Sequence, residues 1–225
     1  MSLMADAMLL ARKDMVVEIR ARQAIASAGA LATIALVLVG LAVGPDPARL
    51  RELAPSLVWI VILYAAIAVA DRLDRIDRSD DAFAGFWLVL EDRRSIFVGR
   101  VLSLGVALAL LQLGTWAAAT VLLDAPMRWE SVLLVPLSGL TSFTAATATA
   151  LVLALVGDAG HRSLLLPVVL LPLLVPTFLA GVEVSSAVLE ARLGDAGGWT
   201  VALFIEAALF TGLGLLTYEP AAQPD

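Results

Sequence analysis

The sequence predicts an all-α, polytopic membrane protein with six transmembrane helices. Of its 225 residues, 60% are hydrophobic and 16% are charged, whereas about 45–50% of the residues in a soluble domain are apolar. The mean hydropathy is +0.93, and the apolar residues fall in blocks of about 20, the length of helix that crosses a bilayer. A soluble domain of this size has too little interior to bury so much apolar surface.

The six apolar blocks form one transmembrane domain over residues 1–225. The second block has 15 residues, or about 22 Å of helix. Because this is too short to cross a bilayer, we expect its helix to continue into the flanking segments. The predicted spans are 24–43, 56–70, 101–123, 132–156, 163–182 and 199–217.

The basic residues indicate how the chain crosses the membrane. With both termini inside, eleven of the 15 basic residues lie on the inner side and four on the outer side. Basic residues accumulate on the cytoplasmic side of membrane proteins, so both termini are predicted to be cytoplasmic. Trp59, Trp129 and Trp199 lie near the predicted outer ends, where we interpret them as interfacial aromatic residues.

The residues before the first span predict an amphipathic helix that lies on the inner surface of the membrane lipid. The alternative is a plain cytoplasmic tail whose arginines only set the topology. The apolar positions, at helical spacing, are Met8, Leu9, Met15, Val16 and Ile19, and the basic positions opposite them are Arg12, Lys13, Arg20 and Arg22.

The segment 71–94, between the second and third spans, is the best candidate for docking a partner protein. Its first half interleaves aspartate and arginine, and pairs four residues apart, such as Asp71 and Arg75, support a helix. Its second half is apolar and aromatic. The alternative is a solvated connector whose apolar half lies on the membrane. The candidate docking residues are Asp71, Arg72, Arg75, Asp77, Asp80, Phe83, Phe86 and Trp87.

One carboxylate falls inside a predicted span. Glu206 lies about 10 Å of helix beyond Trp199, and an unpaired charge there costs about 2.5–3.5 kcal/mol. Glu206 should therefore face a neighbouring helix, a wet cavity or a second subunit, or be protonated. It is either part of a translocation or coupling pathway or a helix-packing residue, bonded for instance to a threonine of 132–156.

Two other spans have unusual compositions. Pro167, Pro172 and Pro176 each remove a backbone donor from the fifth span, which predicts a kinked or broken helix. The residues 184–189 that follow it are interpreted as a separate outer-surface or re-entrant helix. The fourth span carries serines and threonines among alanines, a face suited to close helix packing.

The residue types that are missing exclude several functions. There is no cysteine and only one histidine, His161, so one chain cannot build a thiolate site or a two-histidine haem site. No GxxxxGK[ST] phosphate loop, HExxH or GxSxG motif occurs. We therefore expect a non-enzymatic chain that binds no cofactor or metal directly, and nothing points to nucleic acid.

Residues 12–25 read RKDMVVEIRARQAI. This stretch resembles the N-terminal RKDLxxELRxRE stretch of the haem exporter protein B family (CcmB), the permease subunit of the cytochrome c maturation ABC transporter. Gly44-Pro45, Ala54-Pro55 and Trp59 resemble its outer loop and second span, and the fifth span is similarly rich in proline. The sequence departs from the family where the usual Asp-Gly is Asp80-Asp81, where the acidic residue before Gly-Leu is Ala84, and where the turn that usually carries Ala-Pro is Val89-Leu90-Glu91. Matches in the inner loop are Arg72, Asp80, Ala82, Gly85, Asp92, Arg93, Ile96, Phe97, Gly99 and Arg100.

The resemblance implies an ABC exporter permease-like fold in a bacterial inner membrane, with 71–90 as the coupling helix. It also implies several partners: an ATPase subunit (CcmA-like) that uses the ATP, a haem-handling membrane protein (CcmC-like) and a small single-span protein (CcmD-like). A haem chaperone (CcmE-like) and a second permease copy are implied as well. The complex, rather than this chain, would handle haem.

Three other functions stay open at the level of sequence. A general six-span ABC permease for another cargo predicts the same inner loop and the same ATPase. A proton-coupled carrier would use Glu206, but no second intramembrane carboxylate or inverted repeat accompanies it. The third is a purely structural membrane scaffold.

Overall fold

The computed structural model describes residues 6–13, 24–79, 94–126, 128–156 and 162–221. All regular elements in these ranges are helices, and six of them are long and apolar enough to cross a membrane. The predicted all-α, six-span fold is therefore confirmed. Residues 6–13 are helical. The other elements are α2 (Ala24–Val43), α3 (Pro47–Ser79), α5 (Arg94–Leu122), η1 (Trp129–Leu133), α6 (Leu134–Val156), α7 (Arg162–Leu189), η2 (Leu193–Asp195) and α8 (Ala196–Ala221).

The second span is longer than its apolar block at both ends, as expected. Helix α3 begins at Pro47, and proline suits a first helical position because the missing N–H has no partner there. Asp46 caps this end, since its Oδ1 accepts hydrogen bonds from the backbone N–H of Ala48 (3.0 Å) and of Arg49 (3.4 Å). At the other end, the helix continues to Ser79.

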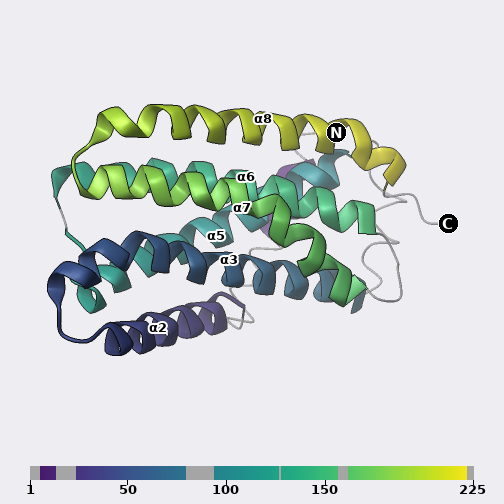
Figure 1. Cartoon of the computed structure of the whole chain (residues 1–225). Helices are drawn as coiled ribbons and strands as arrows, with labels where there is room; N and C mark the ends of the chain where they lie inside the picture. Colours follow the sequence, from purple (N-terminus) through teal and green to yellow (C-terminus); the bar gives the residue numbers. More distant parts are fainter. Residues whose placement is uncertain (1–5, 14–23, 80–93, 127, 157–161, 222–225) are drawn as a thin grey trace.

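The fifth span is a single helix, which corrects one prediction. Helix α7 runs unbroken to Leu189, so residues 184–189 extend this span instead of forming a separate surface or re-entrant helix. The helix contains Pro167, Pro172 and Pro176 and is bent in Figure 1. Neighbouring turns hold such a helix together where a proline removes one backbone donor.

The helices form a bundle with α6 at its centre (Figure 1). Helix α6 packs against α5, α7 and α8, and 72% of its span is buried, compared with 17% for α2 and 22% for α8. Helices α2 and α8 lie at opposite edges.

The two ends of the bundle differ in what they contain. Residues 6–13 and the C-terminal end of α8 lie at one end of the bundle, which we call the terminal end. The α2–α3, α5–η1 and α7–η2 connections lie at the other, which we call the far end.

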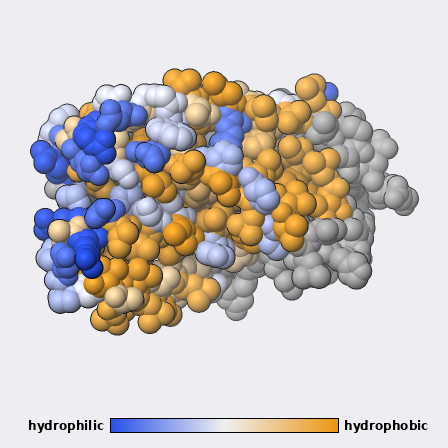
Figure 2. All heavy atoms as spheres, in the orientation of Figure 1, coloured by the Kyte–Doolittle hydropathy of each residue, from blue (hydrophilic) through white to orange (hydrophobic). Residues whose placement is uncertain are grey.

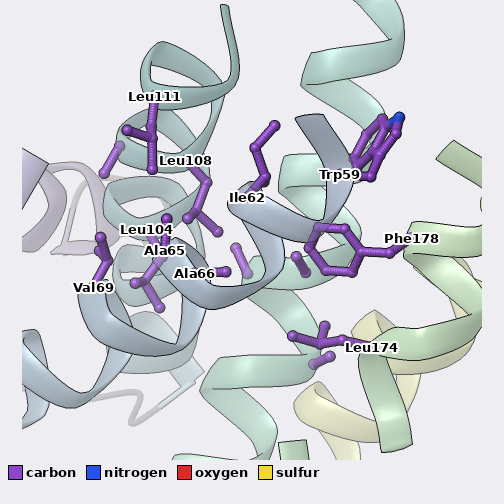
Figure 3. Close-up of a cluster of buried hydrophobic side chains, with 14 of the residues drawn as sticks. Trp59, Ile62, Ala65, Ala66, Val69, Leu104, Leu108, Leu111, Leu174 and Phe178 are labelled. Carbon is purple, nitrogen blue, oxygen red and sulfur yellow. The ribbon is translucent and has the colours of Figure 1, made fainter. Parts of the chain in front are cut away.

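Trp59 anchors the core between α3 and α7 (Figure 3). Its ring is buried, packs edge-to-face on Phe178 with centroids 5.5 Å apart, and its Nε1–H donates to Ser185 Oγ at 2.9 Å. The prediction that Trp59 is an interfacial residue is therefore wrong. Because α3 starts at Pro47, Trp59 lies about 18 Å along the helix. Trp129 and Trp199 are exposed at the far end.

Charged side chains gather at the far end, beside an apolar surface over the helices (Figure 2). Arg51 of α3 forms an ion pair with Asp124 after α5, which joins two connections. Arg192 pairs with Glu190 and Asp195. Hydrogen bonds to Glu190, and then to Asp195, raise the pKa of Arg192 above its ordinary value, so this guanidinium stays charged at any physiological pH.

Candidate functional site

Glu206 lies midway along α8, partly exposed at the edge of the bundle. It is ten residues from Ala196 and ten from Leu216, about 15 Å of helix in each direction. The hydroxyl that faces it belongs to Thr177 of α7, and not to a threonine of 132–156. Thr177 is fully buried, so its hydroxyl meets the Glu206 carboxyl group from inside the bundle.

A second polar cluster lies between α5 and α6. Gln112 is buried, and its Oε1 accepts hydrogen bonds from the hydroxyls of Thr141 and Ser142, both at 3.2 Å. The Gln112 Nε2 has no partner among the described residues, and neither do Ser138 Oγ and Trp116 Nε1. These bonds join the third and fourth spans where hydrocarbon offers none. The serines and threonines were predicted from the sequence as a packing face but Gln112 was not, although an amide within an apolar span is itself a sign of such bonding.

Two close helix contacts lie at the first turns of α5. A β-carbon added to Gly99 of α5 would lie 2.8 Å from Cβ of Leu10 and 3.0 Å from the carbonyl oxygen of Ala7. A β-carbon added to Gly214 of α8 would overlap the ring of Phe97. The first turns of α5 thus contact both the N-terminal helix and α8. Nothing in the sequence pattern shows which helices these two glycines contact.

The predicted docking residues are only partly covered by the structure. Asp71, Arg72, Arg75 and Asp77 lie in the last turns of α3, whose backbone is helical to Ser79. Asp80, Phe83, Phe86 and Trp87 fall outside the described residues, as does His161. In the N-terminal helix, Ala7, Leu10 and Ala11 are buried, and the apolar Met8 and Leu9 are exposed. Met15, Val16, Ile19, Arg20 and Arg22 lie outside the described residues.

No cluster suited to metal binding is found among the described residues. No three histidine, cysteine, aspartate or glutamate side chains come together there. Most of the buried polar side chains among the described residues are serine and threonine hydroxyls, and Gln112, Arg100, Asp6 and Glu130 are buried as well. The Gln112 amide oxygen accepts hydrogen bonds across two helices.

The fold defines a polytopic helical protein, with six helices long and apolar enough to cross a membrane and a helical extension of α3 at one end. The model of the CcmB protein family matches residues 5–223, so the chain belongs to the CcmB family.

The chain is similar to curated proteins named "Heme exporter protein B" over much of its length. It is 32% identical to the one from Bradyrhizobium diazoefficiens over 68% of this chain and 69% of that protein. It is 30% identical to the one from Paracoccus denitrificans over 84% of each chain, and 30% identical to the one from Pseudomonas aeruginosa over 71% of this chain and 70% of that protein.

Proposed function

We propose that this chain is the membrane permease subunit of an ABC transporter complex for cytochrome c maturation. In this complex a partner subunit hydrolyses ATP, and the permease couples hydrolysis to haem delivery or to release of a haem-loaded chaperone. The proposal is supported by family membership over residues 5–223 and by the name of its relatives. The chain has no phosphate loop, which fits a division of labour between two subunits.

The observation that carries the coupling role is the length of α3. Its apolar window ends at Val69, yet the helix continues for ten residues to Ser79, about 15 Å beyond the membrane core. A rigid helix of this length can transmit a push on 71–94 directly into the second span. The α5 helix begins immediately after this segment and contacts both residues 6–13 and α8, so the same push would reach two further elements.

The proposed orientation places the terminal end in the cytoplasm of a bacterial cell, below the inner membrane. Eleven of the 15 basic residues then lie on the cytoplasmic side, in agreement with the positive-inside rule. ATP is available on that side. The proposed partners are an ATPase, a haem-handling membrane protein, a small single-span protein, a haem chaperone and a second permease copy, with haem as the cargo of the complex.

The coupling role is tested by replacing Arg72 and Asp80 together with alanine. We expect the double variant to remain in the membrane at normal levels but to lose cytochrome c maturation, because the ATPase no longer engages the 71–94 segment. The matched control removes an exposed pair at the far end, Arg192→Ala with Asp195→Ala, whose ion pair contributes little to stability. Normal maturation in the Arg72/Asp80 variant would refute the coupling role.

A further inference from the structure

Three buried polar groups between α5 and α6 have no hydrogen-bond partner among the described residues. They are Nε2 of Gln112, Nε1 of Trp116 and Oγ of Ser138, and each of these residues is more than nine-tenths buried. Buried polar groups in folded proteins are nearly always hydrogen-bonded, either to protein or to an ordered water. Three such groups on neighbouring turns therefore point to a bound molecule.

The register of α5 against α6 brings these groups to the same stretch of the interface. Gln112 Oε1 accepts hydrogen bonds from Thr141 and Ser142, both at 3.2 Å, which shows where the two helices face each other. The chain turns from α5 into α6 at the far end (Figure 1). One helical turn toward that end lie Trp116 on α5 and Ser138 on α6, on the same faces as the bonded residues. The helices thus place an indole N–H and a hydroxyl beside the Gln112 amide.

Other hydroxyls of α6 provide an internal comparison for Ser138. Thr144 donates its proton to the carbonyl of Leu140 at 2.9 Å, and Thr147 donates to the carbonyl of Thr144 at 2.8 Å. A bond of this kind satisfies a hydroxyl in an apolar span without any outside partner. Ser138 Oγ forms no such bond, so this hydroxyl is left for a partner outside its own helix.

We propose that a water molecule is bound between α5 and α6, where it accepts hydrogen bonds from Gln112 Nε2–H and Trp116 Nε1–H and donates one to Ser138 Oγ. Water fits this set because a buried water typically makes about three hydrogen bonds and can both accept and donate. A metal cation does not fit, since the indole and the amide nitrogen are donors only. Water also suits either orientation of the Gln112 amide, because it can donate to the oxygen as readily as it accepts from the nitrogen.

The test detects water beside individual tryptophan side chains by NMR. The full chain is labelled with isotope-enriched tryptophan and placed in lipid bilayers with the subunits that copurify. Magnetisation transfer from water protons to each indole N–H proton is then measured, and each signal is assigned by its loss in a tryptophan-to-phenylalanine variant. Two other tryptophans calibrate the transfer: Trp59 donates to Ser185 inside the core, and Trp129 is 77% exposed at the far end.

We expect transfer from water to Trp116, although its side chain is buried, and none above background to Trp59. Ser138→Val replaces the hydroxyl with methyl groups that fill its space and offer no hydrogen bond, so the transfer to Trp116 should be lost. Ser138→Ala, which removes the hydroxyl without adding bulk, should lower it. The matched control is Thr144→Val, which removes a buried hydroxyl already bonded within its own helix and should leave the transfer unchanged. Unaltered Trp59 and Trp129 signals show that the variants are folded.

Three results would overturn the bound water. Transfer to Trp116 no greater than to Trp59 would show that the indole N–H is dry. Transfer that persists in both Ser138 variants would place the water elsewhere, and an equal loss in Thr144→Val would assign the effect to general repacking of α6. The site depends on neither the ATPase nor haem, so each of these results leaves the proposed function untouched.

Discussion

Replacing Trp59 with alanine is expected to lower the free energy of unfolding by about 2–3 kcal/mol. The substitution removes a buried ring, its edge-to-face contact with Phe178 and the hydrogen bond to Ser185. In water-soluble proteins such truncations cost about 3–5 kcal/mol. We expect less here because the unfolded reference stays in an apolar solvent, so mainly the packing and the hydrogen bond are lost.

The measurement is equilibrium unfolding in mixed micelles with an increasing fraction of a denaturing detergent. Trp129→Ala is the matched control, because Trp129 is 77% exposed at the far end and its loss opens no cavity. The variant Trp59→Phe keeps most of the ring and should fall between the two. If Trp59→Ala unfolds at the same detergent fraction as Trp129→Ala, the core described here is wrong.

Gly214→Val is expected to destabilise the protein by about 1–3 kcal/mol, the usual cost of overfilling a packed interior. Any β-carbon at this position overlaps the Phe97 ring, which is itself buried and has little room to move. Helix α8 would have to move away from the first turns of α5. Since α5 follows the proposed coupling segment, we also expect cytochrome c maturation to fall.

The control for this prediction lies two residues away on the same helix. A β-carbon at Gly212 meets no atom within 4 Å, so Gly212→Val changes helix propensity without changing packing. The Phe97→Ala substitution should recover part of the stability lost in Gly214→Val, because it removes the overlapping ring. Equal unfolding transitions for the two valine variants would contradict the contact between α5 and α8.

The spans were predictable because an uninterrupted apolar block of about 20 residues is rarely anything other than a transmembrane helix. The block 24–43 coincides with α2, and the short block 56–70 extends at both ends as its length required. The end of the fifth span was misjudged because Glu183 interrupts the apolar run. In the structure Glu183 is exposed near the far end, where a charge does not stop the helix.

The packing partners were not predictable to the same degree. A helix that is apolar all round carries no periodic face, so the sequence shows how deep Trp59 or Glu206 lies along its helix and not which way it points. The sequence placed Glu206 within a span correctly, yet the facing hydroxyl comes from α7. The sequence likewise does not show that Gly99 faces the N-terminal helix or that Gly214 faces Phe97.

The central claim, that this chain is the permease of an ATP-driven haem complex, is tested most directly by identifying its partners. The chain would be tagged at its C-terminus, purified from native membranes in mild detergent, and its companions identified by mass spectrometry. We expect a phosphate-loop ATPase together with a haem-handling membrane protein. An ATPase without haem proteins would contradict the cytochrome c role and favour a general exporter. Failure to recover any ATPase, even after crosslinking, would contradict the central claim.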